Sequence, residues 1–372
     1  MKAEYTILEK NHILGGPQLD LKYSNNSTLN FYKEKSKKSE TLKVLSLFSG
    51  CGGMDLGFEG GFSVLKSSIN EVLSPDFIDK KIDSNFVQLK KTKFKTVFAN
   101  DILNDARNAW VNHFLKKGRE ADLFYTQSIV DLVKLHQSGE SVFPENIDVV
   151  TGGFPCQDFS IAGKRNGFNS HKNHNGKIIN EQNPTENTRG LLYMWMKQVI
   201  EITKPKIFVA ENVKGLVNLE NVKEIIQNDF SSAGENGYIV LNPRVLHSAN
   251  YGVPQSRERV IFIGIKKSEL NDSALQELQK EIVSDRFNPY PNPTHSFTAK
   301  GQNLKKFVAL NEVFNFLSEP ENTTDLSQKF YSKAKYMGVP LRVGLFAISP
   351  RSFLAVGFPL LSLTQINNRQ LN

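Results

Sequence analysis

Cysteine is scarce in this sequence: its 372 residues include only Cys51 and Cys156, which lie in two separate glycine-bearing stretches. Two thiols cannot supply the four ligands of a thiolate zinc site, and such sparse use of cysteine indicates a reducing compartment. His171 and His174 do not make a metal site without cysteine or acidic partners. We therefore expect no bound metal.

Long apolar runs are also missing. No stretch of eighteen apolar residues occurs, and the first residues (Met1–Tyr5) lack the apolar centre of a signal peptide. We therefore expect a cytoplasmic protein with no membrane partner. The 46 basic residues against 38 acidic ones give a net charge of +8, which is mild for a nucleic-acid-binding protein but has the right sign.

The most informative stretch that is present runs from Gly152 to Ser160 and reads Gly-Gly-Phe-Pro-Cys-Gln-Asp-Phe-Ser. It follows an apolar segment that predicts a buried strand, so it should form the loop at that strand's carboxyl end, where ligands collect in open α/β sheets. Pro155 fixes the backbone before the thiol, which makes Cys156 a candidate nucleophile. A small buried hydrophobic residue is the alternative interpretation of Cys156.

A second stretch, Val44–Phe58, predicts a strand, a glycine-dense turn and a helix. Glycines allow a cofactor to approach the backbone, and the helix amino terminus offers free N–H groups. The spacing Gly50-x-Gly52-Gly53 differs from the dinucleotide fingerprint, and an ordinary loop would also explain it. The strand–turn–helix setting is what it shares with nucleoside-cofactor sites.

Two further segments place charged side chains at strand ends. Glu211 follows the apolar run Lys206–Ala210, where it could donate to a ring nitrogen or merely cap the next helix. Arg257 and Arg259 alternate at period two, so both should point to one face. A guanidinium group suits carbonyl and phosphate oxygens, although a solvent-facing edge strand is an equal alternative.

In this order, the segments resemble the DNA cytosine-5 methyltransferases, from about Lys43 to Lys266. The family implies an α/β, Rossmann-like S-adenosylmethionine-dependent methyltransferase fold with a mixed, mostly parallel sheet. The matching parts are Phe48–Gly53, Gly153–Ser160, Arg189–Leu192, Glu211–Val213 and Gln255–Val260.

The resemblance implies a mechanism. The Cys156 thiolate would attack C6 of cytosine, Glu211 would bind the base at N3 and the exocyclic amine, and Arg259 with Arg257 would hold O2. Because C6 is stacked inside a duplex, the target nucleotide must be flipped into the pocket. The resemblance also implies DNA contacts from the catalytic loop and the polar stretch after it: Gln157, Ser160, Lys164 and Arg165.

The resemblance implies S-adenosyl-L-methionine as the cofactor. Phe48 would face the adenine, and the turn formed by Ser49, Gly50, Cys51, Gly52 and Gly53 would hold the methionine part. Asp101 is the candidate for the ribose hydroxyls, and Ser128 stands where an aspartate often contacts the adenine amine. Pro155 would lie between cofactor and base, and Leu192 near the cofactor. The lysine-rich insertion between Ser63 and Thr96 is longer than usual for the family.

The carboxyl-terminal part departs from the family pattern. Residues 326–338 resemble the opening of a target-recognition region, but the two motifs that usually follow are missing, and Gly357–Pro359 is a faint echo of one. We therefore predict a polar arm over residues 1–41, a catalytic domain over 42–267, and a partial, smaller recognition region with an atypical tail over 268–372.

The resemblance implies double-stranded DNA as the partner, and a cognate restriction endonuclease as the functional counterpart. A truncated or split enzyme that binds nucleic acid, but needs a complementing chain to act, is the first alternative. A tRNA cytosine-5 methyltransferase is the second.

Overall fold

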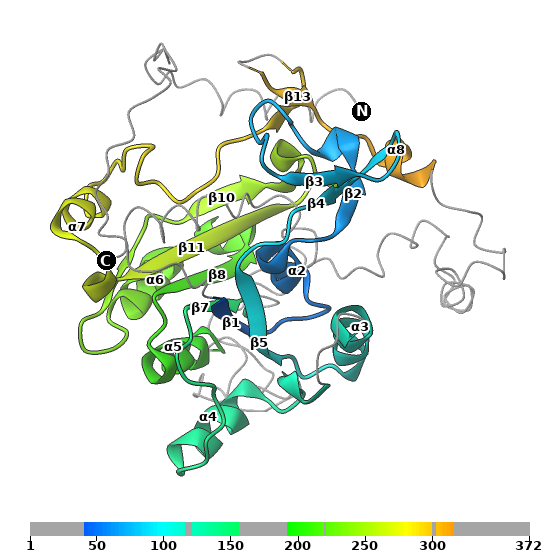
Figure 1. The fold of residues 1–372 in the computed structure, drawn as a ribbon. Coiled ribbons are helices and arrows are strands. Elements are labelled where there is room, and N and C mark those ends of the chain that lie inside the picture. The colour runs from blue at the N-terminus through cyan, green and yellow to red at the C-terminus, as the bar shows by residue number, and fades with distance from the viewer. Residues whose placement is uncertain (1–40, 116–120, 156–191, 219–220, 300–302, 316–372) are drawn as a thin grey trace, which may run out of the picture. The chain divides into compact units, whose positions relative to one another are not determined.

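The computed structural model describes residues 41–115, 121–155, 192–218, 221–299 and 303–315. Its centre is an eight-stranded sheet with the strand order β10-β11-β8-β7-β1-β5-β6, in which β9 also pairs with β11. The strands from β8 to β6 run parallel, and β11 is antiparallel to β8, β9 and β10. This is the predicted α/β, mixed and mostly parallel arrangement (Figure 1).

The strands are short and apolar. In chain order they are β1 (Leu42–Leu47), β5 (Phe94–Asn100), β6 (Phe124–Tyr125), β7 (Val149–Gly152), β8 (Ile207–Val213), β9 (Tyr238–Val240), β10 (Arg244–His247) and β11 (Glu258–Lys266). The helices are α2 (Gly53–Glu59), α3 (Asn104–Leu115), α4 (Ile129–Gln137), α5 (Leu192–Thr203), α6 (Val222–Ser231), α7 (Asp272–Leu278) and α8 (Leu310–Phe314).

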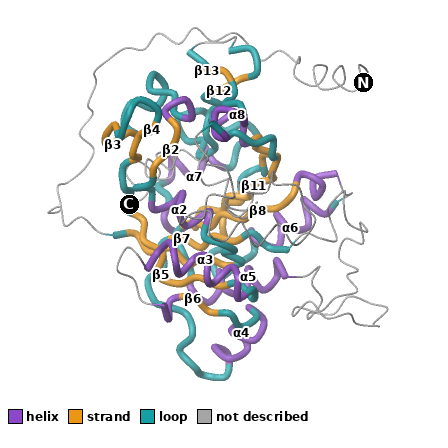
Figure 2. The backbone as a smooth tube through the Cα atoms, turned by 90° about the vertical axis from the view of Figure 1, so that its right-hand side faces the viewer, coloured by secondary structure: helices purple, strands orange, loops and turns teal. Residues whose placement is uncertain are grey.

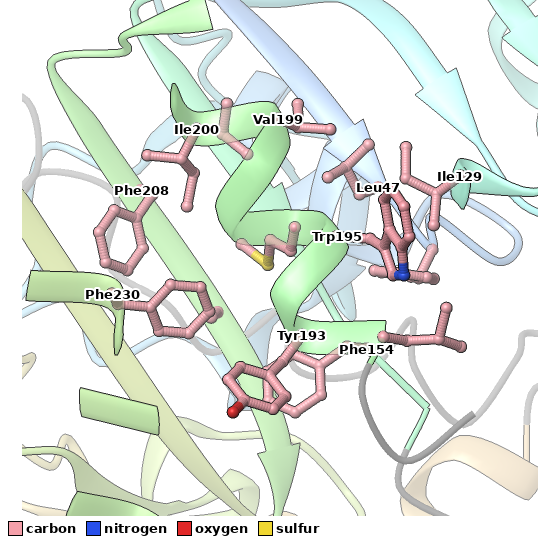
Figure 3. Packing of buried hydrophobic residues seen from close by; sticks show 14 of the residues in the cluster. Leu47, Ile129, Phe154, Tyr193, Trp195, Val199, Ile200, Phe208 and Phe230 are labelled. Atoms are coloured by element: carbon pink, nitrogen blue, oxygen red, sulfur yellow. The ribbon is translucent and has the colours of Figure 1, made fainter. Parts of the chain in front are cut away.

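Alternate residues of the strands bury opposite faces of the sheet. In β8, Phe208 and Ala210 belong to the core cluster that α4, α5 and α6 cover, whereas Ile207 and Val209 belong to the cluster that includes residues of α2 and α7. Apolar residues on both faces are what a parallel sheet between two helical layers requires. Figure 3 shows the first cluster, in which Val199 and Ile200 of α5 lie among side chains from the sheet and neighbouring helices.

The aromatic residues that open α5 are core residues. Tyr193 and Trp195 are buried among the residues of the first cluster, as the sequence predicts.

The segment that follows β11 in the chain packs on the other face of the sheet. Residues 270–290, including Leu278 and Tyr290, share the second core cluster with Ile261 and Ile263 of β11. The domain boundary at residue 267 stays a prediction.

The lysine-rich insertion forms a small sheet of its own, with β2 (Ser63–Leu65), β4 (Phe86–Leu89) and β3 (Ile78–Lys81) in that order. A further pair of short parallel strands, β12 (His295–Ser296) and β13 (Lys305–Lys306), lies beyond α7 in the chain. In the ribbon view and in the tube view, these two small sheets lie at the same end of the molecule (Figures 1 and 2). Among the described helices, none is long and apolar enough to cross a membrane.

Candidate functional site

The pairing of β8 with β11 brings Glu211 and two arginines to the carboxyl end of the parallel sheet. Glu211 lies opposite Ile261, and Arg259 lies opposite Val213, so the acid and the arginine are diagonal neighbours on one face. The Nε atom of Arg259 is 2.7 Å from Oε1 of Glu211, and Nη2 of Arg257 is 3.9 Å from the same oxygen.

This acid–arginine cluster is sheltered from solvent. The side chains of Glu211, Arg257 and Arg259 are 10%, 11% and 17% exposed. Among the described residues, Nε of Arg259 and Oε1 of Glu211 form an ion pair whose geometry does not meet that of a hydrogen bond. Nη1 of Arg259 donates to the Glu258 carbonyl at 2.7 Å. Two guanidinium groups thus face one carboxylate, and Oε1 of that carboxylate keeps hydrogen-bonding capacity.

The loop after β7 starts beside this cluster. A Cβ atom at Gly153 would lie 3.1 Å from Oε2 of Glu211, so a larger residue there would press on the carboxylate. Phe154 is 3% exposed and packs on Tyr193, with ring centroids 6.1 Å apart (Figure 3). Nδ2 of Asn212 also donates to the Phe154 carbonyl at 3.5 Å. These contacts fix the backbone that leads into the half-buried Pro155.

The thiol expected to act next to this cluster, Cys156, lies outside the described residues, and so do the four predicted DNA contacts Gln157, Ser160, Lys164 and Arg165. In the sequence, Cys156 directly follows Pro155. Its role stays a prediction.

The glycine-rich turn after β1 adopts the backbone that its glycines permit. Gly50 and Gly52 have φ values of 56° and 85°, and the buried Phe48 also has a positive φ of 51°. Ser49 joins the turn to β5: its N–H donates to the Asn100 carbonyl at 2.8 Å, and its Oγ accepts from the Asn100 N–H. Cys51 is half-buried.

Trp110 of α3 packs against Gly52 of this turn. This residue was not identified from the sequence. A Cβ atom at Gly52 would lie 2.5 Å from Cδ1 of Trp110 and 2.6 Å from Cε2 of Phe114. The Trp110 indole N–H donates to Oδ2 of the fully buried Asp55, 2.7 Å away. The signal that could have found this pair is an aspartate among the apolar residues of α2, close to a row of glycines.

Asp101 fastens the turn to the end of β5. Its Oδ2 accepts from the Gly50 N–H and its Oδ1 accepts from the Leu103 N–H, both at 3.0 Å. Asp101 is 5% exposed. Both oxygens therefore have a structural task, in addition to the predicted ribose contact, which stays a prediction.

Ser128 and Leu192, two further predicted cofactor residues, lie at the amino-terminal ends of helices. Ser128 is the N-cap of α4, where its Oγ accepts from the Val130 N–H at 3.3 Å. Nδ2 of Asn100 donates to the carbonyls of Tyr125 and Gln127, which ties the end of β5 to the segment before Ser128. Leu192 is buried in the first core cluster. Their predicted cofactor contacts are untested.

The geometry defines a class of protein: an α/β enzyme-like domain with a glycine-rich turn and a buried acid–arginine cluster on neighbouring strand ends. Among the described residues, no group of three or more histidine, cysteine and acidic side chains could hold a metal ion. The family model of C-5 cytosine-specific DNA methylase matches residues 42–343, which is most of the chain. This chain therefore belongs to the C-5 cytosine-specific DNA methylase family.

Its relatives are type II methyltransferases. The chain is 31% identical over 288 residues to the Type II methyltransferase M.BsuRI of Bacillus subtilis, covering 76% of this chain and 53% of the relative. It is 32% identical over 284 residues to M.BspRI of Lysinibacillus sphaericus, covering 76% and 54%. The chain thus spans about half the length of these curated relatives.

Among solved structures, the chain is similar to the DNMT2 of Spodoptera frugiperda. The identity is 19%, the TM-score is 0.38, and 70% of this chain and 60% of that chain are covered. This score is too low to assign a substrate.

Proposed function

We propose that this chain carries the catalytic site of a DNA cytosine-5 methyltransferase, which methylates C5 of a cytosine in a specific duplex site and so protects DNA from a restriction endonuclease. The observation that carries the proposal is the buried cluster of Glu211, Arg257 and Arg259 beside the loop that leads to Cys156. Family membership and the type II relatives support the reaction class.

The nucleophile in this proposal is Cys156. Its thiolate adds to C6 of the flipped cytosine, forming a C–S bond and placing the electron pair of the C5–C6 double bond on C5. After C5 has gained its methyl group, a base removes the C5 proton. The C5–C6 double bond then re-forms as the C–S bond breaks, and the thiolate is regenerated.

The acid–arginine cluster holds the base during these steps. In this proposal the Glu211 carboxyl group takes up a proton when the base binds, so that its O–H donates to N3 and its other oxygen accepts from the exocyclic amine. The donated hydrogen bond stabilises the negative charge that shifts onto N3 as the thiolate attacks. Arg259 and Arg257 hold the cytosine O2 with their planar guanidinium groups.

The glycine-rich turn fits S-adenosyl-L-methionine. Gly50 and Gly52 allow the positive φ values that shape this turn at the helix amino terminus, and a side chain at Gly52 would collide with Trp110. The other proposed binding residues are Phe48, Ser49, Cys51, Gly53, Asp101, Ser128, Pro155 and Leu192. When bound there, the cofactor supplies the methyl group.

The test is transfer of labelled methyl groups to unmethylated bacterial DNA, with the Cys156→Ser variant as the control. We expect label on cytosine C5 that depends on Cys156, while the variant retains cofactor binding. Glu211→Gln should lower the rate strongly with little change in DNA affinity. Turnover retained in Cys156→Ser would rule out the covalent route, and full activity of Glu211→Gln would make Glu211 a structural residue.

A further inference from the structure

The insertion and the β12–β13 pair join through a buried polar network. Asn70 is 2% exposed, and its Nδ2 donates to the carbonyls of Thr294 and Asn303 at 2.9 and 2.6 Å. Its Oδ1 accepts from the N–H groups of Val72 and Leu73. All the hydrogen-bonding groups of this amide are used, so the network fixes the two small sheets against each other.

His295 makes a second link between the same segments. It is fully buried, and its Nε2 lies 3.0 Å from the Ser67 carbonyl, so Nε2 carries the proton and donates. Its Nδ1 then accepts from the Thr294 hydroxyl at 2.9 Å. Gly252 packs closely against the backbone of Ser68, since a Cβ atom at Gly252 would lie 2.1 Å from the Ser68 carbonyl oxygen.

An open cavity of about 450 Å³ lies where these segments meet. Two ammonium groups belong to its wall: that of Lys66, whose ion pair with Glu71 is long at 3.8 Å and exposed, and that of Lys305, which donates to the Ile69 carbonyl at 2.6 Å. Glu312 is the acidic residue among its lining, and its carboxylate accepts from the Ala309 N–H. The other lining residues are Leu65, Ser67, Ser84, Asn85 and Asn315.

Exposed lysines follow the cavity on both segments. Lys80 and Lys81 lead into the turn that carries Ser84 and Asn85, with the exposed Asp79 and Asp83 on the same segment, and Lys306 is exposed on β13. Lysine side chains neutralise phosphate groups when a protein binds duplex DNA.

From this arrangement we propose that the cavity binds phosphate groups of duplex DNA outside the flipped nucleotide. The inference rests on the proposed function, which supplies DNA as the partner. Hydroxyl and amide groups from Ser67, Ser84 and Asn85 donate to phosphate oxygens beside the charge of Lys66. The buried network of Asn70 and His295 holds the wall in place before DNA arrives.

The experiment compares two charge-matched double variants. Lys66→Gln/Lys306→Gln removes one charge from the cavity wall and one from the exposed residue that follows Lys305 on β13. Lys93→Gln/Lys95→Gln removes the same charge from exposed positions at the start of β5 in the central sheet, where Lys95 pairs with Lys43 of β1. Binding of a fluorescent 30-base-pair duplex is measured between 50 and 300 mM salt, together with methyl transfer at saturating DNA.

We expect the cavity variant to raise Kd at least about tenfold at 100 mM salt and to lower the salt slope by about 1.8, as two lost phosphate contacts require. The control should keep the parental Kd, slope and rate at saturating DNA. Equal Kd and slope for the two variants would overturn the proposal.

The outcomes separate this proposal from the proposed function. If the parent binds DNA but transfers no methyl group, the proposed function fails and the salt comparison still decides the cavity. If the parent transfers methyl groups and the cavity variant binds as the parent does, the cavity proposal alone fails. A parent that does not bind DNA overturns both.

Discussion

Removing Arg259 should be costly because it leaves a buried carboxylate. Arg259→Met takes away the guanidinium 2.7 Å from Glu211, whose side chain is only 10% exposed. Breaking a buried ion pair by removing one partner costs about 3–5 kcal/mol. We expect the lower end, about 3 kcal/mol, because Arg257 remains 3.9 Å from the same oxygen.

The assay is urea unfolding at pH 7.5, in which a lower midpoint with an unchanged slope reports lost stability. Lys214→Met is the control, because the Lys214–Glu258 pair is as short, 2.8 Å, but 44% and 41% exposed. An exposed pair is worth below about 1 kcal/mol.

A double-mutant cycle tests the cause of the loss. In a Glu211→Gln background no buried charge is left behind, so Arg259→Met should cost at least about 1 kcal/mol less than in the parent. An equal loss in both backgrounds, or a loss no greater than that of the Lys214 control, would refute the assignment of the stability to this ion pair.

Two further predictions concern the turn and the buried histidine. Gly52→Ala forces a methyl group against Trp110 at a φ of 85°, so it should lower stability by about 2–4 kcal/mol and weaken cofactor binding, as calorimetry would show; parental values would contradict this. Burial lowers the pKa of His295 from 6.5, so an unfolded chain binds a proton that the folded protein does not. The free energy of unfolding should therefore fall as the pH drops below about 6.5, and less so in His295→Gln; identical pH profiles would contradict it.

Sequence periodicity was enough to predict the framework of the site. The apolar strands ending at Gly152, Ala210 and Leu47 predicted a parallel sheet, and the period-two spacing of Arg257 and Arg259 predicted their common face, on which the structure places Glu211. These features depend on local backbone geometry, which a sequence pattern encodes directly.

Contacts between distant segments could not be predicted in this way. Asp101 was assigned to a ribose, yet the structure also ties it to the Gly50 N–H, 51 residues away. The link from Asn70 to Thr294 spans 224 residues. Such hydrogen bonds depend on how whole elements pack, and no local pattern of residues records that.

The position of Trp110 under the glycine-rich turn gives the protein an internal optical probe. The chain has two tryptophans, and Trp195 lies in the separate core cluster around α5. A Trp195→Phe protein would emit from Trp110 alone. Because that indole touches the space beside Gly52 and is hydrogen-bonded to Asp55, its emission reads out shifts of the turn without any added label.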